Sequence, residues 1–318
     1  MADPKAPLDP RAIRTVSIHE RPSKVEEKEF IGTLSPGMGF KAWLDALPDI
    51  LAARDLREVA HAIVAARSEG RPVVLGMGAH AIKVGLSPLL ISLMERKIIT
   101  AVAMNGAGAV HDYEVALAGR TSEDVAATLD TGMFGMTRET GEGLNTAMAR
   151  SGREEIGLGR AVGEAIMTGG FAHAARSILA SAARLDLPAT VHVAIGTDIT
   201  HMHPSADGAA IGLGSLRDFR IFAAAVAELK GGVYLNLGSA VIMPEVFLKA
   251  LSLARNLGHT VDAFTTVNMD FISHYRPGVN VVERPVRTGG RGYRLIGHHE
   301  IMLPLLFAAV MEYGGTGP

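Results

Sequence analysis

The sequence predicts a doubly wound α/β fold built on a mostly parallel sheet. Short apolar runs alternate with longer segments whose apolar residues recur at helical spacing, a pattern typical of strand–helix–strand units. Each apolar run ends in glycine or small polar residues, as strands do where they border a ligand at their carboxyl ends. The predicted strands are Pro72–Leu75, Ile98–Met104, Pro188–Ile195, Gly232–Leu237 and Ala263–Asn268.

Helices are predicted between these strands and at both ends of the series. The glycine-broken segment Ala116–Ser151 is the exception: it is predicted to be irregular and to act as a lid, apart from a helix start at Thr121–Asp124. The predicted helices are two amphipathic ones between Phe40 and Val64, Leu86–Met94, Arg160–Leu185 (which Gly169–Gly170 could interrupt), Ser215–Leu229, Pro244–Asn256 and Ile301–Met311.

The amino-terminal region differs from the rest of the chain. Residues 1–38 carry Pro4, Pro7, Pro10 and Pro22 and a charged run, which predicts a partly flexible arm. Such an arm is either a solvated tail or a segment that reaches over the site of a neighbouring subunit. Residues 39–318 contain no linker and are predicted to form a single α/β domain.

Composition excludes several classes of function. With 31 Lys and Arg against 33 Asp and Glu, and no basic tract, the chain lacks the excess of positive charge that is typical of nucleic-acid-binding proteins. No run approaches the ~18 apolar residues of a membrane span, and the first residues lack the apolar core of a signal peptide. The absence of cysteine excludes disulfides, thiolate nucleophiles and Cys-ligated metals. We therefore expect a cytoplasmic protein with a small-molecule ligand or a protein partner.

The strand ends predict the position of the site. The carboxyl ends of parallel strands share one edge, so these polar turns would form a wide rim suited to a dinucleotide, or they are only tight turns. Gly76-Met-Gly78 lacks the third glycine of the usual dinucleotide fingerprint, so a dinucleotide would have to be held differently. The turns are Gly76–His80, Asn105–Gly108, Gly196–Asp198, Gly238–Ser239 and Asn268–Asp270.

Titratable residues follow three of these turns. His111 and Asp112 are predicted as acid, base or substrate anchor, because an adjacent carboxylate can tune a histidine. His201 and His203 are also predicted as catalytic. Together with Asp198 they could instead hold a divalent metal, to which His298, His299 and Glu300 could add ligands. Predicted substrate-binding residues are Glu114, Arg276 and His298.

Four stretches resemble the deoxyhypusine synthase family. They are Leu75-Gly-Met-Gly-Ala-His80, Met104–Asp112 (MNGAGAVHD), Gly232–Val241 (GVYLNLGSAV), and Val267-Asn-Met-Asp270 through Arg276-Pro277. The resemblance spans roughly Gly39 to Pro285. It implies a Rossmann-like fold with NAD bound across the strand ends, a polyamine-like substrate and a homotetramer with sites between paired subunits.

The resemblance also implies residues for the cofactor and the substrate. Asp112 and nearby acids would meet a cationic substrate, and Asp207 is an alternative to Asp198 at the cofactor. The predicted cofactor-binding residues are Gly76, Gly78, His80, Asn105, Gly106, Ala107, Gly108, Asp198, Gly238, Ser239 and Asp270.

One departure from that family limits the chemistry. The family forms an imine on a lysine shortly after its Arg-Pro pair, whereas Pro277–Pro285 here contains no lysine. Arginine cannot replace it because it stays protonated. Lys83, Lys230 and Lys249 lie in predicted helices and are poor substitutes. We therefore predict an NAD-dependent enzyme acting on a small amine or amino-acid-like substrate without a lysine adduct. The alternatives are a metal-assisted hydrolase or lyase, and a non-catalytic NAD- or polyamine-binding protein.

Overall fold

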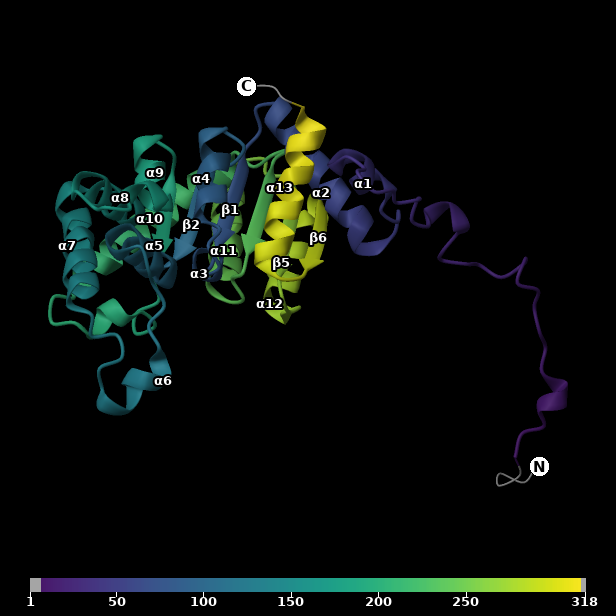
Figure 1. Cartoon of the computed structure of the whole chain (residues 1–318), viewed down its shortest axis with the longest axis horizontal. Helices are drawn as coiled ribbons and strands as arrows, with labels where there is room; N and C mark the ends of the chain where they lie inside the picture. Colours follow the sequence, from purple (N-terminus) through teal and green to yellow (C-terminus); the bar gives the residue numbers. More distant parts are fainter. Residues whose placement is uncertain (1–6, 316–318) are drawn as a thin grey trace.

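The computed structural model describes residues 7–315 and confirms the doubly wound α/β fold. Six strands form one all-parallel sheet in the order β3-β2-β1-β4-β5-β6. Figure 1 shows the sheet between two layers of helices. The strands are β1 (Val73–Met77), β2 (Ala101–Asn105), β3 (Ala189–His192), β4 (Val233–Leu237), β5 (Thr265–Asp270) and β6 (Arg291–Ile296).

The predicted strands all exist, but the sequence did not reveal β6. It lies at the sheet edge, where its two faces differ: Tyr293 and Leu295 are buried, whereas Arg291 and Arg294 are exposed. A short edge strand with arginines on its outer face lacks the continuous apolar run of a central parallel strand. The segment after Asp270 was accordingly predicted as an irregular loop.

The long helices are α1 (Phe40–Ala46), α2 (Leu51–Ser68), α4 (Ser87–Glu95), α5 (Gly106–Ala118), α7 (Arg138–Glu154), α8 (Leu158–Thr168), α9 (Ile178–Arg184), α10 (Gly208–Ala227), α11 (Ile242–Asn256) and α13 (His299–Gly314). The predicted helices are present, with the stretch Arg160–Leu185 divided into α8 and α9, and the structure adds α5 and α7, which were not predicted. Short helical turns are α3 (His80–Lys83), α6 (Val125–Thr128) and α12 (Tyr275–Pro277), and a π-helical turn covers Gly278–Glu283.

The predicted lid is more regular than expected. Gly141 and Gly143 lie inside the helix α7 and do not interrupt it. A side chain at Gly141 would collide with the His203 ring, and one at Gly143 with the Tyr113 hydroxyl, so these glycines permit close packing. Only residues 119–137, around α6, are irregular, and Figure 1 shows this segment projecting beyond the carboxyl edge of the sheet.

Two apolar cores lie on the two faces of the sheet. Leu75 and Met77 of β1 point into the larger core, which also contains side chains from α2, α4, α5, α8, α9 and α13. Val74 of β1 and Tyr234 of β4 point into the smaller core, with Phe222 of α10 and Phe247 of α11. Residues on one strand alternate between the cores because successive side chains point to opposite faces.

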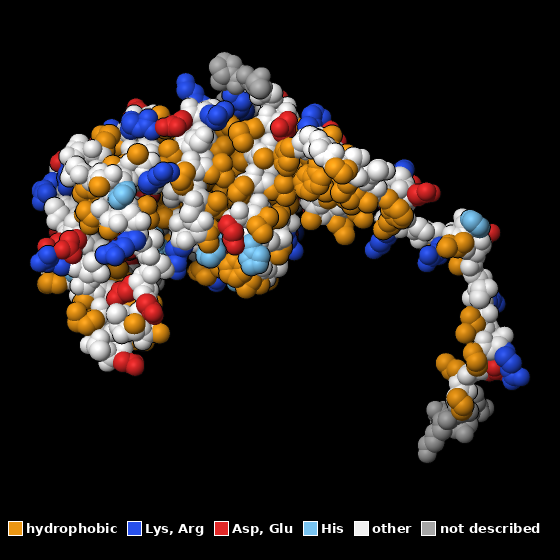
Figure 2. Space-filling view, in the orientation of Figure 1, with side chains coloured by type: hydrophobic (Ala, Val, Ile, Leu, Met, Phe, Trp, Pro, Cys, Tyr) orange, Lys and Arg blue, Asp and Glu red, His pale blue; other side chains and the backbone are white. Residues whose placement is uncertain are grey.

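The amino-terminal segment extends away from this body. Figure 1 shows the backbone of this segment reaching away from the helices and strands. Large apolar side chains along it are exposed, including Leu8, Val16 and Ile18. The first tie to the body is Glu29, whose carboxylate accepts a 2.7 Å hydrogen bond from Arg54 of α2. Figure 2 shows apolar side chains gathered where this segment meets α1 and along the front of the body near α4 and α13. Within residues 7–315, no helix is both long and apolar enough to cross a bilayer.

Candidate functional site

The candidate site begins at the topological switch point between β1 and β4. From β1 the chain crosses towards β2 and β3, and it then returns to β4 on the other side. Ligands of open α/β sheets bind at such a point, outside the carboxyl ends of the strands. The turn Gly78–His80 follows β1 and the turn Gly238–Val241 follows β4, so the two predicted glycine turns lie next to each other.

The glycines in these turns are required by contacts within the chain. A side chain on Gly78 would collide with the carbonyl oxygen of Gly238, which itself has a positive φ of 59°. A side chain on Gly76 would collide with the Tyr234 hydroxyl, and one on Gly106 with the Asp198 carboxylate. These glycines therefore allow neighbouring strand ends to approach closely, and they do not by themselves indicate a phosphate.

Three rings gather beside the switch point. His80 begins α3, Phe271 follows β5 and His299 begins α13; the His80 centroid lies 5.1 Å from that of His299 and 5.5 Å from that of Phe271. His299 is fully buried, and its Nδ1 has no hydrogen-bond partner. Burial lowers the pKa of His299, so its neutral form is favoured. Phe271, by contrast, is 46% exposed.

Polar residues on the same rim are held by local bonds. The Ser239 hydroxyl accepts a hydrogen bond from the Met243 backbone N–H, in the first turn of α11. The Asp270 carboxylate is buried; one oxygen accepts from the Phe271 N–H at 2.8 Å, and the other lies 3.9 Å from His274 Nε2. Asn105 caps α5 by accepting from the Gly108 N–H. The predicted turn Asn105–Gly108 is thus the first turn of a helix.

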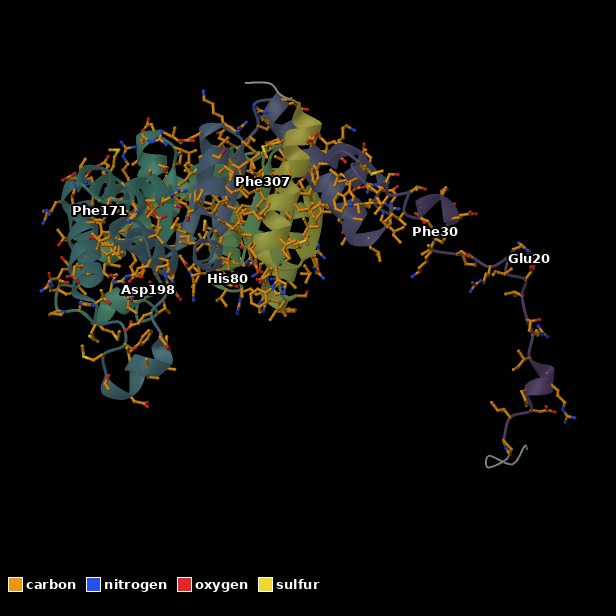
Figure 3. All side chains as sticks on the ribbon, in the orientation of Figure 1. Glu20, Phe30, His80, Phe171, Asp198 and Phe307 are labelled. Carbon is orange, nitrogen blue, oxygen red and sulfur yellow. The ribbon has the colours of Figure 1, made fainter. Side chains whose placement is uncertain are left out.

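A cavity of about 200 Å³ lies further along the rim, beside the first turns of α5. Its wall includes Lys83 at the end of α3, His111 and Glu114 of α5, Glu123 before α6 and Asp198 after β3. Figure 3 shows His80 and Asp198 along the same edge of the molecule. From the sequence, Lys83 is a poor substitute for the imine-forming lysine because it lies in a predicted helix. In the structure, Lys83 lines this cavity.

Two side chains that line the cavity have shifted pKa values. Burial raises the pKa of Asp198, and the neighbouring His201 opposes this shift. Burial lowers the pKa of His111, against the attraction of Glu114. Asp198 Oδ2 is buried and has no hydrogen-bond partner. Shifted groups that share a cavity mark a candidate functional site when the geometry agrees.

Asp112, predicted as catalytic, does not lie on this rim. It is fully buried and accepts hydrogen bonds from the Ser177 hydroxyl (2.6 Å) and the backbone N–H groups of Ile178 (2.7 Å) and Leu179 (3.0 Å). These donors form the start of α9. We therefore assign Asp112 to holding α5 against α9 and remove it from the candidate site.

The predicted histidine cluster is not assembled as a metal site. The His201 Nδ1 accepts from the backbone N–H groups of Gly196 (3.1 Å) and Asp198 (3.3 Å), and the His203 Nε2 lies 2.9 Å from the Gly135 carbonyl oxygen. Across residues 7–315, no three His, Asp or Glu side chains are placed to hold one metal ion. Because two backbone donors occupy its Nδ1, His201 can only donate from Nε2 and is unsuited to act as a base.

The other predicted substrate residues are also accounted for. Arg276 pairs with Glu245 at 2.8 Å. The His298 side chain is 72% exposed, whereas its neighbour His299 belongs to the ring group. The sequence predicts His298, and not His299, as substrate-binding. His299 is the histidine that reaches the candidate site, because it is the first residue of α13 and packs over Gly238.

With this geometry known, the fold can be compared with solved structures. No protein-family model matches the sequence, and no curated protein does either. The fold is similar to that of a conserved putative LOR/SDH protein from Methanococcus maripaludis S2 (TM-score 0.52, 16% identity, 83% of this chain and 71% of that chain). It is also similar to AgrE in a ternary complex with ornithine and NAD+ (TM-score 0.51, 14% identity, 83% of this chain and 34% of that chain).

A third similar structure is ArgZ, an arginine dihydrolase from the ornithine–ammonia cycle in cyanobacteria (TM-score 0.50, 17% identity, 83% of this chain). This chain spans only about a third of the length of AgrE and of ArgZ. A putative deoxyhypusine synthase from Entamoeba histolytica is only 10% identical, with a TM-score of 0.49. The comparisons thus show a shared fold and do not make this chain a deoxyhypusine synthase.

Proposed function

We propose that this chain is an NAD-dependent enzyme that acts on a small amine or amino-acid-like substrate. The observation that carries the proposal is the rim itself: the turns after β1 and β4 meet at the switch point, with His80, Phe271 and His299 on one side and the α5 cavity on the other. AgrE, which shares the fold, was crystallised with ornithine and NAD+, and this supports the choice of ligands.

The residues at the switch point fit a dinucleotide. The turn Gly238–Val241 would hold its phosphates, because it leads directly into the amino-terminal end of α11 at that edge. Phe271 would stack on one of its rings, and the unpartnered Nδ1 of His299 would meet a polar atom. Asp198 lies against Gly106 at the start of α5, so this helix is a poor anion site. NAD+, when bound, would supply a hydride acceptor.

The substrate would lie in the α5 cavity. Lys83 provides a positive charge for a carboxylate, and the Asp198 carboxylate, which also lines the cavity, provides a negative charge for an ammonium group. No lysine adduct is part of this proposal.

Titration calorimetry is the first test of the proposed function. We expect NAD to bind, and Phe271→Ala to weaken binding about tenfold, since stacking on an aromatic ring contributes roughly 1–3 kcal/mol. Ile272→Ala is the matched control, because Ile272 is the adjacent residue and is 51% exposed. Ornithine, arginine and small diamines are then screened with NAD for formation of NADH.

The outcomes separate the alternatives. Absence of heat with both NAD and NADP would overturn the cofactor assignment. NAD binding without NADH formation on any amine would favour a non-catalytic NAD- or polyamine-binding protein.

A further inference from the structure

A chain of hydrogen bonds connects three residues at the wall of the α5 cavity. Thr121 Oγ1 lies 2.6 Å from His111 Nδ1 and 2.5 Å from Glu114 Oε2. The other oxygen of Glu114 accepts a 3.0 Å hydrogen bond from the Thr140 hydroxyl of α7. Thr121 therefore stands between the histidine and the carboxylate, and both oxygens of Glu114 are engaged.

This arrangement fixes the tautomer of His111. A glutamate carboxylate has no proton to donate, so the single hydroxyl proton of Thr121 points to Glu114. The Thr121 oxygen must then accept from His111, which requires a proton on Nδ1. Nε2 is left with its lone pair, and the hydrogen bond on one ring nitrogen thus sets the chemistry of the other.

Charged groups from several elements face this histidine. Lys83 of α3 opposes its protonation, and Glu114 of α5 favours it. Glu123 and Asp198 also line the cavity, but Glu123 already accepts a 2.9 Å hydrogen bond from the Gly135 N–H. Asp198 Oδ2 makes no hydrogen bond; it is buried against Gly106 and lies 3.9 Å from His201 Nε2. The side chains of His111 and Glu114 are only 17% and 18% exposed, so the bond chain is largely shielded from water.

We propose that the α5 cavity is a proton-transfer site, in which His111 Nε2 takes a proton from the ammonium group of a small amine. Asp198 attracts the ammonium, and Thr121 and Glu114 are positioning residues that hold the imidazole. The proposal rests on the proposed function for the identity of the ligand. In the step, an N–H bond of the ammonium breaks, its electron pair stays on nitrogen, and the proton moves to Nε2. The resulting imidazolium keeps its Nδ1–H on Thr121, and Glu114 stabilises its charge.

Nuclear magnetic resonance on the full chain, with histidine labelled in the ring nitrogens, tests the bond chain directly. His111→Gln identifies the resonances. In the wild type we expect a protonated Nδ1 and an unprotonated Nε2 at pH 7.5. Thr121→Val, which keeps the shape and removes the hydroxyl, should mix the tautomers and lower the pKa of His111 by about one unit, because the link to Glu114 is lost.

Two further variants show that the hydroxyl is responsible. Thr121→Ser should restore the wild-type tautomer and pKa. Thr168→Val removes an exposed threonine hydroxyl that bonds within α8, far along the chain, and should change neither. A protonated Nε2 in the wild type, or a His111 signal unaffected by Thr121→Val, would overturn the proposal.

The proton-transfer role has its own readout. Ornithine, used as the amine probe, should shift the His111 Nε2 resonance, and Asp198→Asn should weaken this response at least tenfold. A resonance that ornithine leaves unchanged would overturn the role in proton transfer. NAD binding, measured by calorimetry on the same samples, should be equal in wild type and Thr121→Val. Failure to bind NAD would therefore count against the proposed function without altering the result for His111.

Discussion

A carboxylate next to a glycine turn can serve either a ligand or the fold, and Asp112 shows how the two differ. In the sequence it follows the Asn105–Gly108 turn together with His111, which suggested that both would face a substrate. Because the turn is the first turn of α5, consecutive residues point in different directions around the helix. His111 reaches the cavity, whereas Asp112 points to the start of α9. Sequence proximity alone could not separate them.

Asp112→Ala should destabilise the protein without affecting the rim. The change leaves the Ser177 hydroxyl and two backbone N–H groups buried without an acceptor, and we expect the free energy of unfolding to fall by about 3 kcal/mol. Urea unfolding followed by circular dichroism measures it. Asp124→Ala is the matched control: it removes an exposed carboxylate that caps α6 and should cost about 1 kcal/mol or less. Equal losses in the two variants would contradict the role given to Asp112.

At the scale of secondary structure, the sequence predicted what burial on both faces makes visible. The five strands that it revealed are continuous apolar runs because helices cover both sides of a parallel sheet. It missed β6, where only alternate residues are buried. It also predicted that Gly141 and Gly143 break the chain, whereas glycine is required there because Tyr113 and His203 pack closely against α7. The carboxyl edge on which the candidate site lies was predicted, since strand polarity is readable from the chain. Its ring group and bond chain were not, because they unite residues from distant elements.

The buried Asp218 joins three elements and should make stability depend on pH. It lies on α10, and its Oδ2 accepts from the backbone N–H groups of Val191 in β3 (2.7 Å) and Gly159 in α8 (2.9 Å). Burial raises its pKa to about 7, and these hydrogen bonds oppose the shift. A raised pKa in the folded state means a stabilising contribution that is complete below the unfolded value of ~3.9 and is lost as pH rises through about 7.

Asp218→Asn should therefore flatten the pH dependence of stability. The amide keeps one oxygen for the two backbone donors and cannot ionise. Between pH 5 and 7 the wild type should lose up to about 1.4 kcal/mol per pH unit relative to this variant. Urea unfolding of both proteins across pH 5–8 measures the difference. For Asp130→Asn, at an exposed position, the curve of unfolding free energy against pH should run parallel to that of the wild type. Parallel curves for Asp218→Asn as well would show that Asp218 stays ionised when buried.

At the scale of the whole molecule, one edge of the sheet concentrates the candidate chemistry, and the amino-terminal segment lies outside it. All six strands run in one direction, so the ring group after β1, β5 and β6 and the cavity after β2 and β3 share that edge. The amino-terminal segment has no buried residue between positions 7 and 28. Its contacts begin at Glu29 and Gly32, which bond to Arg54 and Ala46. The body should therefore fold without residues 1–28.

Deletion of residues 1–28 tests this separation. Exposed segments contribute little to stability, so the truncated chain should unfold within about 0.5 kcal/mol of the intact chain. Arg54→Ala is the contrasting variant: it removes the contacts to Glu29 and Asp49 at the edge of the body and should cost about 1 kcal/mol. Light scattering on the same samples tests the predicted homo-oligomer, whose mass should be a multiple of 33.5 kDa. If the segment reaches over a neighbouring subunit, the truncated chain should form a smaller oligomer while its body stays folded. Unfolding of the body on truncation would instead show that these exposed residues belong to its core in solution.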